Sequence, residues 1–361
     1  RYNSFDMIRS YEAAVKFLEL YIPPPAKKFP AQLGLDRMRY LCDLLGNPQL
    51  KYKTIHVGGT SGKGSTATII ATILAQKYKV GLHTSPHLVK VNERLKIVSK
   101  FSRGPLAISA RRPLMKENII SRSSLMRGVE ILNNKFIELI NEIKPIVKQT
   151  ENSKWGKPSY FEITTAMAFL YFAKQKVDYA VIEVGMGGRF DGTNVIQPEV
   201  AVLTNVGLDH TEILGDTVEK IARDKTGIIK EGIRVVSGVK QPSVLKIVQD
   251  MCRKKNASLS VISRGTLAIS AKDPLIRYEI KKMTETGSVF DYKGDASFQN
   301  LTLNLLGANQ VENACLAIRT IEKLGLNVML NLFQHLVTKK NETLKQVQGD
   351  SFKITSDDIY T

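Results

Sequence analysis

A run of glycines between a short β-branched stretch and an apolar helical pattern constrains this chain most. Residues 56–66 read HVGGTSGKGST; KTI precedes them and ATIIATILAQKYK follows. Strand, glycine loop and helix in this order form the context of a phosphate-binding P-loop. The spelling is unusual, because Val57 stands where the common pattern has its first glycine and Gly64 separates Lys63 from Ser65. A plain glycine-rich turn between strand and helix is the alternative.

The residue types in this loop suit a triphosphate. Glycines let the backbone turn tightly and aim its amide protons at one point, and the next helix adds its positive N-terminal end. Lys63 supplies a mobile cation for the β- and γ-phosphates, and Ser65 or Thr66 offers a hydroxyl for Mg²⁺. We therefore predict a nucleotide site over Gly59, Thr60, Gly62, Lys63, Gly64, Ser65 and Thr66.

Further apolar stretches predict the fold class. Strands are expected at residues 179–185, 200–207, 234–239 and 258–262, with helical patterns between most of them. Continuous apolar strands alternating with helices indicate an α/β fold with a mostly parallel sheet covered on both faces. Ligands of such sheets collect beyond the carboxyl ends of the strands, where the glycine loops of this chain also fall.

Two residues after these strands are candidate metal ligands. Glu183 interrupts an apolar strand near its carboxyl end, where a carboxylate is costly unless it is paired or metal-bound. Mg²⁺ beside a phosphate loop is one partner, and a buried ion pair with Arg189 or another basic residue is the other reading. His210, in the run TNVGLDH, is either a ligand or an ordinary loop residue.

A lysine on an apolar helix stripe is the third candidate. Asp216 is predicted to cap the helix, with Glu219 completing a capping box, and Lys225 shares the apolar face further along. Such a lysine snorkels, finds an anion or loses its charge, and spacing alone favours snorkelling. An uncharged amine can react with CO₂ to give a carbamate, which is a metal ligand. Ser85 follows the strand KVGLHT and can lie near the phosphates, whereas Glu162 at a helix start is either functional or simply a helix-terminal charge.

A repeated segment does not belong to this pattern. SRGPLAISARRPL at residues 102–114 recurs as SRGTLAISAKDPL at residues 263–275, identical at ten of thirteen positions. A structural repeat would extend further and keep a fixed period. We expect inserted surface segments over 101–116 and 263–275; a basic arm that contacts a partner is the alternative.

Charge and composition indicate which partners and which cellular compartment to expect. The net charge is +18, but the basic residues are spread along the chain without an aromatic-rich signature, so we expect no nucleic-acid partner. No apolar run is long enough to cross a bilayer, and the three cysteines are scattered, which suits a reducing compartment. We expect a cytoplasmic monomer without membrane contact.

Seven runs together resemble the folylpolyglutamate synthase and dihydrofolate synthase family of the Mur ligase superfamily. They are LGLDRMRYLCDLLGNPQ, HVGGTSGKGST, GLHTSPHLVKVNER, FEITTAMAF, VIEVGMGGRFDGTN, NVGLDHTEILGDTVEKIARDKTGIIK and LLGANQVENACLAI. They fall in the order expected of the family and cover most of residues 11–325. The shortened loop is the spelling that this superfamily uses for ATP, with Ser61 in place of the usual asparagine.

The resemblance implies a ligase. ATP would phosphorylate a carboxylate of dihydropteroate or of a folate, and the amine of L-glutamate would attack the acyl phosphate. It further implies that Lys63 holds the triphosphate and that two Mg²⁺ ions are bound. The first ion would be bound by Ser65, Ser85 and Glu183. The second would be bound by Glu183, His210 and Lys225 as its carbamate. Asn309 and Asn313 would contact the adenosine. A sister Mur-type ligase with another substrate, or an inactive ATP-binding remnant, are the alternatives.

The end of the chain departs from the family pattern. Family members carry a C-terminal α/β domain, whereas the resemblance fades here after IEKLGLNVM. We expect a first domain over residues 1–300 and an incomplete, truncated second domain over residues 301–361. If that holds, ATP·Mg²⁺ binding would persist while ligase turnover is weak or absent.

Overall fold

The computed structural model describes residues 7–23, 35–99, 128–264 and 276–326. The described strands form one eleven-stranded sheet in the order β11-β10-β9-β8-β7-β6-β1-β5-β2-β3-β4. The strands are β1 (Lys53–Gly58), β2 (Val80–His83), β3 (Leu95–Val98), β4 (Val129–Glu130), β5 (Tyr179–Glu183), β6 (Val200–Leu203), β7 (Arg234–Ser237), β8 (Ser258–Arg264), β9 (Ile276–Thr284), β10 (Gly287–Lys293) and β11 (Ser297–Leu303). The helices are α1 (Tyr11–Glu19), α2 (Asp36–Leu44), α3 (Lys63–Leu74), α4 (Asn133–Glu151), α5 (Tyr160–Lys174), α6 (Thr211–Leu214), α7 (Val218–Lys225), α8 (Pro242–Lys254) and α9 (Ala308–Lys323), with short 3₁₀ turns η2 (Pro48–Leu50), η3 (Val91–Arg94), η4 (Gly192–Val195) and η5 (Thr226–Ile228).

The centre of the sheet is parallel, which confirms the predicted α/β fold. β1 lies between β5 and β6 and is parallel to both, and β2, β7, β8 and β9 continue the parallel pairing outward. Strands β3, β4, β10 and β11 pair antiparallel at the two ends of the sheet. The sequence patterns did not predict these four strands, nor β9, which pairs parallel with β8 and antiparallel with β10. β9 shows why: most of its residues are exposed or half-buried, so it lacks the continuous apolar run of a central strand.

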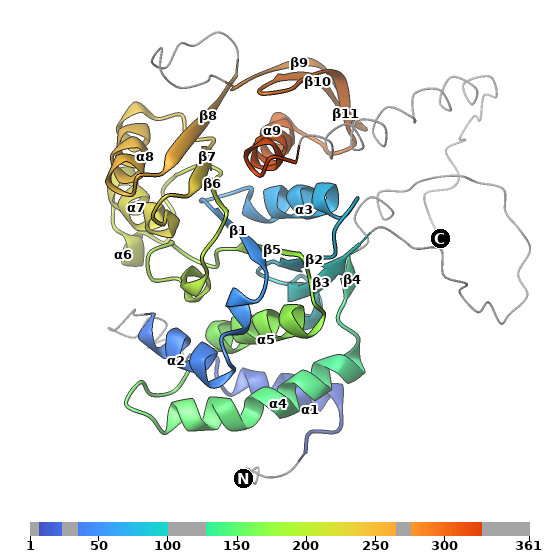
Figure 1. Ribbon diagram of the computed structural model, residues 1–361, viewed down its shortest axis with the longest axis vertical. Helices are drawn as coiled ribbons and strands as arrows, with labels where there is room; N and C mark the ends of the chain where they lie inside the picture. The colour runs from blue at the N-terminus through green and yellow to red at the C-terminus, as the bar shows by residue number, and fades with distance from the viewer. Residues whose placement is uncertain (1–6, 24–34, 100–127, 265–275, 327–361) are drawn as a thin grey trace, which may run out of the picture.

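Helices cover both faces of the parallel strands (Figure 1). On one face α3 and α9 pack side by side, and their apolar residues share a core with Val200 and Val202 of β6. On the other face lie α5, with α1, α2 and α4 packed outside it, and α8, whose Val248 and Cys252 share an apolar cluster with Ala201 and Leu203. Alternate residues of one strand therefore enter different cores, as the pleat requires.

The predicted domain boundary at residues 300–301 falls inside β11. The chain continues through α9 without leaving the first core, because α9 packs against α3 and contributes Val311, Leu316 and Ile321 to the shared apolar cluster. The expected second domain, from residue 327 on, lies outside the described residues. So does the expected insertion at 101–116, and of the second copy of the repeat only Ser263 and Arg264, the last residues of β8, are described.

One local prediction was wrong. Thr217, not Asp216, is the N-cap of α7, because its hydroxyl accepts the backbone N–H of Lys220. Asp216 instead forms an exposed ion pair with Lys220, 2.8 Å between Nζ and Oδ1. Glu219 therefore does not complete a capping box; its carboxylate accepts the Ser243 hydroxyl instead. Threonine and aspartate are both good N-cap residues, so residue type does not choose between them. Among the described helices, none combines the length and the apolar character that crossing a membrane requires.

Candidate active site at the carboxyl edge of the sheet

The glycine loop follows β1 and ends at the first turn of α3. Gly62 is the N-cap of α3 and has φ +77°, a left-handed conformation that glycine adopts at little cost. Gly59 also has a positive φ, and a Cβ atom there would collide with the hydroxyl of Thr204. Lys63 bends back over the loop, and its Nζ donates to the carbonyl oxygen of Thr60 at 3.1 Å. The loop therefore holds its shape through backbone geometry that requires glycine.

The loop after β6 clamps the glycine loop from the side. The Oδ1 atom of Asn205 accepts the backbone N–H of Ser61 at 2.9 Å, and its Nδ2 donates to the Ser61 hydroxyl at 2.9 Å. Thr204 donates its hydroxyl to the carbonyl oxygen of Ser61 at 2.6 Å, and Gly207 donates its N–H to the Thr60 hydroxyl at 3.0 Å. The two loops touch because β1 and β6 are parallel neighbours whose carboxyl ends lie at one edge.

Helix α9 brings an asparagine to the same loop. Asn313 is buried, and its Oδ1 accepts the hydroxyl hydrogen of Thr66 at 3.3 Å. A Cβ atom on Gly62 would overlap that Oδ1 atom. Asn309, one turn earlier on α9, is exposed. Of the two asparagines predicted to contact adenosine, the structure thus places Asn313 against the phosphate loop.

Glu183, the last residue of β5, lies behind the loop. Its side chain is buried, and Oε2 accepts the backbone N–H of Ser85 at 2.8 Å. Burial raises the pKa of this carboxyl group to about 7, and the hydrogen bond from Ser85 opposes that rise. In the described residues Glu183 forms no ion pair with Arg189, whose guanidinium lies over the Phe190 ring. The alternative of a Glu183–Arg189 pair is therefore wrong.

Lys225, at the end of α7, turns inward rather than snorkelling. Its side chain is almost fully buried, and Nζ donates to the carbonyl oxygen of Gly59 at 3.0 Å. Burial lowers the pKa of this amine to about 8, and the nearby positive charge of Lys63 lowers it further. A minor fraction of Lys225, far larger than for an exposed lysine, is accordingly the neutral, nucleophilic amine near neutral pH.

The remaining predicted ligands are less tightly placed. Ser65 is half-buried in the first turn of α3, and Ser85 stands on the loop after β2. His210 is the left-handed N-cap of α6, with its side chain about half exposed and Nε2 3.7 Å from a carboxylate oxygen of Asp209. Across the ranges that the structure covers, no three His, Cys, Asp or Glu side chains converge as a metal cluster.

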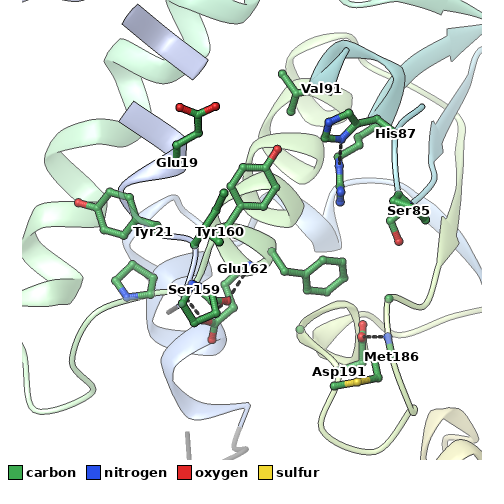
Figure 2. A pocket seen from close by; sticks show the side chains of 18 of the residues that line it. Glu19, Tyr21, Ser85, His87, Val91, Ser159, Tyr160, Glu162, Met186 and Asp191 are labelled. Carbon is green, nitrogen blue, oxygen red and sulfur yellow. Dashed lines mark hydrogen bonds between the residues drawn. The ribbon is translucent and has the colours of Figure 1, made fainter. Parts of the chain in front are cut away.

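A large cavity of about 1420 Å³ opens beside these groups. Figure 2 shows its breadth: Glu19 and Tyr21 stand on one wall, Tyr160 and Glu162 in the middle, and Ser85, Met186 and Asp191 on the opposite wall. His210 and Asp224 also line it. The cavity thus extends from helix α1 to the loop that contacts Glu183.

The cavity contains charged residues that the sequence patterns did not single out. Arg94 lies over the Tyr160 ring, with Cζ 5.5 Å from the centroid, and its Nε donates to Nδ1 of His87 at 2.9 Å (Figure 2). Arg37 binds Glu162 with N–O distances near 3.0 Å. Arg94 belongs to the run TSPHLVKVNER, but an arginine in a polar loop carries no signal of its own until the fold places it in a cavity.

Asp191 forms part of the cavity wall and is held from behind. Its carboxylate accepts the backbone N–H of Met186 at 2.8 Å and both the N–H and the hydroxyl of Thr193. The Thr193 hydroxyl in turn lies 2.8 Å from Nε2 of His56, a fully buried residue of β1. This buried chain of hydrogen bonds ties the strand that leads into the phosphate loop to the wall of the cavity.

A glycine loop at the carboxyl edge of a parallel sheet, followed by a helix N-terminus and flanked by a buried carboxylate, defines a P-loop protein. Comparison with known proteins is more specific. Residues 131–321 match the family model of the Mur ligase middle domain. The chain is 35% identical over 301 residues to the dihydrofolate synthase/folylpolyglutamate synthase of Bacillus subtilis, covering 82% of this chain and 61% of that protein. It is 34% identical over 286 residues to the folylpolyglutamate synthase of Lacticaseibacillus casei, covering 79% and 58%.

Comparison with solved structures points to the same family. The crystal structure of folylpolyglutamate synthase from Thermotoga maritima matches with a TM-score of 0.69 at 35% identity, over 88% of this chain and 62% of that one. An FPGS–AMPPCP–folate complex matches with a TM-score of 0.73 at 30% identity, over 90% and 71%. The chain therefore belongs to the Mur ligase family, in its folylpolyglutamate synthase and dihydrofolate synthase branch. It spans about three fifths of the length of the curated relatives named above.

Proposed function

We propose that this protein is an ATP-dependent ligase that joins L-glutamate to dihydropteroate or to a folate. One observation carries the proposal: the hydrogen bond from the Ser85 amide to Glu183 joins the cavity wall to the carboxylate behind the phosphate loop. An acid bound in the cavity would present its carboxylate beside the γ-phosphate. The carboxylate oxygen attacks the γ-phosphorus and ADP leaves; the glutamate amine, having lost a proton, then attacks the acyl carbon and phosphate leaves.

The phosphate loop would serve positioning and charge neutralisation, which phosphoryl transfer mostly needs. The loop ends at the N-terminus of α3, whose positive end favours an anion, and Lys63, whose Nζ binds the Thr60 carbonyl oxygen, would turn toward a phosphate. Asn313 and, one turn before it, Asn309 would contact the adenosine.

The residues around Glu183 fit Mg²⁺. A cation would stabilise the charged form of this buried carboxylate, which faces the first turn of α3, and the hydroxyls of Ser65 and Ser85 are oxygen ligands of the kind Mg²⁺ prefers. We place a second Mg²⁺ with Glu183, His210 and Lys225 as its carbamate, for which the neutral amine of Lys225 is the starting group. When bound, Mg²⁺ supplies charge neutralisation for the transferred phosphoryl group. The protein's part is to bury Glu183 and to lower the pKa of Lys225, so that part of its amine is neutral.

The cavity supports an aromatic acid as substrate. It combines the rings of Tyr21, Tyr160 and Phe161 with the guanidinium of Arg94, which suits a flat heterocycle carrying carboxylates. The relative whose structure is an FPGS–AMPPCP–folate complex carries such a ligand. The net charge of +18 favours the approach of anionic substrates.

The domain division and the cellular setting remain parts of this proposal. We place the end of the first domain after α9 rather than at residue 300, because α9 belongs to its core. The three cysteines are free and buried, as a reducing cytoplasm permits. A monomer would suffice, since the phosphate loop, the cavity and Asn313 come from one chain.

The test is phosphate release by the full chain with Mg²⁺·ATP and L-glutamate, in the presence of dihydropteroate, folate or neither. We expect release that depends on all substrates and is lost in Lys63→Ala, with nucleotide affinity lost as well. A panel of other acids and amino acids distinguishes a sister Mur-type ligase. Nucleotide binding without any acid-dependent phosphate release would indicate a protein that only binds ATP, and would overturn the proposal that it is a ligase.

A further inference from the structure

The loop of residues 85–90 forms one wall of the cavity, and apolar packing does not hold its tip in place. Leu88 is 91% exposed and Val89 is 81% exposed. Side chains this exposed contribute almost no burial free energy to the conformation of the loop. Another interaction must therefore set the position of this wall.

A single carboxylate supplies that interaction. Glu93, in η3, accepts the backbone N–H groups of three consecutive residues: Leu88 at 2.9 Å, Val89 at 2.8 Å and Lys90 at 2.7 Å. Hydrogen bonds to an ionised acceptor are roughly twice as strong as neutral ones. The three hydrogen bonds, of which the one from Leu88 contributes most, lower the pKa of Glu93 to about 2. We call Glu93 with these three amides the clamp; its carboxylate is charged throughout the physiological pH range.

Both ends of the loop meet residues of the proposed reaction. At one end the Ser85 amide is bound to Glu183. At the other, Arg94 follows Glu93 directly and reaches back to His87, inside the loop, at 2.9 Å. A shift of residues 88–90 would therefore move His87 and its arginine partner relative to the Tyr160 ring, and would pull on Ser85.

We propose that Glu93 is a positioning residue for the acid substrate: its carboxylate holds the 85–90 wall of the cavity and thereby places Ser85 and Arg94. Glu93 itself does not line the cavity. The role in substrate binding rests on the proposed function, whereas the clamp itself rests only on the observed hydrogen bonds.

Hydrogen exchange of the full chain tests the clamp without any ligand. We expect the amides of Leu88, Val89 and Lys90 to exchange at least tenfold faster in Glu93→Ala than in the wild type. Glu93→Gln keeps one acceptor oxygen and should lie between them. Glu138→Ala, which removes an exposed glutamate from α4, is the charge-matched control and should change nothing in this loop. Unchanged exchange in Glu93→Ala would overturn the clamp.

Folate titrated into protein loaded with AMPPCP and Mg²⁺ tests the consequence. We expect affinity to fall about tenfold in Glu93→Ala and less in Glu93→Gln, with AMPPCP affinity and thermal midpoint close to the wild type. A general structural defect would lower nucleotide affinity as well, so an equal loss of both affinities would overturn the positioning role. Wild-type folate affinity in Glu93→Ala would overturn it too. If the wild type binds neither folate nor dihydropteroate, both the proposed function and the role of Glu93 in substrate binding are overturned. Hydrogen exchange would still test whether Glu93 holds the loop.

Discussion

The carboxylate of Glu183 lies directly behind Gly64: a Cβ atom on Gly64 would stand only 3.3 Å from Oε2. Gly64 is the second residue of α3, so the buried acid faces the first turn of the helix that begins at the phosphate loop. A larger residue at position 64 would crowd this carboxylate. The extra glycine that makes the loop unusual thus leaves room for an acid from the neighbouring strand.

Glu183→Gln should abolish the response of the protein to Mg²⁺. Glutamine keeps the acceptor for the Ser85 amide but lacks the charge that would bind the ion. Thermal melts with AMPPCP should show a rise in midpoint on adding Mg²⁺ for the wild type and little or none for the variant. An equal rise in both proteins would place the ion elsewhere.

Gly62→Ala should weaken nucleotide binding by at least tenfold. The left-handed φ of +77° costs alanine roughly 1–2 kcal/mol, and its Cβ would also push Asn313 away from Thr66. Gly232→Ala is the matched control, because Gly232 has φ +67° with nothing within 4 Å of a Cβ atom. Calorimetric titration with AMPPCP should separate the two: both variants lose stability, and only Gly62→Ala loses affinity.

Lys225 should form a carbamate. Its pKa of about 8 leaves enough neutral amine to react with CO₂ near neutral pH. Carbon NMR of the protein with ¹³C-bicarbonate and Mg²⁺ should show a carbamate signal that disappears in Lys225→Arg. Lys230 provides the control, since burial also lowers its pKa to about 8 while its Nζ binds the Asn194 carbonyl away from the loop. Loss of the signal in Lys230→Arg instead would contradict the assignment.

Acid should destabilise the protein partly through His56. Burial lowers the pKa of His56 from 6.5 to about 3, so the unfolded chain binds a proton that the folded chain does not between these values. The stabilisation is complete above pH 6.5 and is lost as pH falls toward 3, with a slope of ~1.4 kcal/mol per pH unit in between. Denaturant unfolding from pH 4 to 6 should show this slope reduced by about that amount in His56→Gln. An unchanged slope would mean that His56 is protonated in the folded protein.

Local sequence patterns were sufficient for the parts of the site that lie within one strand–loop–helix unit. The strand before Gly58, the helix after Gly62 and the apolar run before Glu183 each follow from side-chain period and glycine placement over about ten residues. The end strands β9 to β11 did not follow from the sequence; β9 and β11, for example, are largely exposed or half-buried and show a weak, mixed pattern. The cap of α7 did not follow either, because Asp216 and Thr217 both suit the position.

By itself, then, the sequence determined a parallel α/β sheet with a phosphate loop at its carboxyl edge, since backbone preference and apolar period act between near neighbours. Only the tertiary structure decided what surrounds that loop. Asn313 reaches Thr66 across 247 residues of chain and the Ser85 amide reaches Glu183 across 98, and the order of strands and the packing of α9 on α3 bring them together. Such contacts depend on which elements become neighbours, which no local pattern specifies.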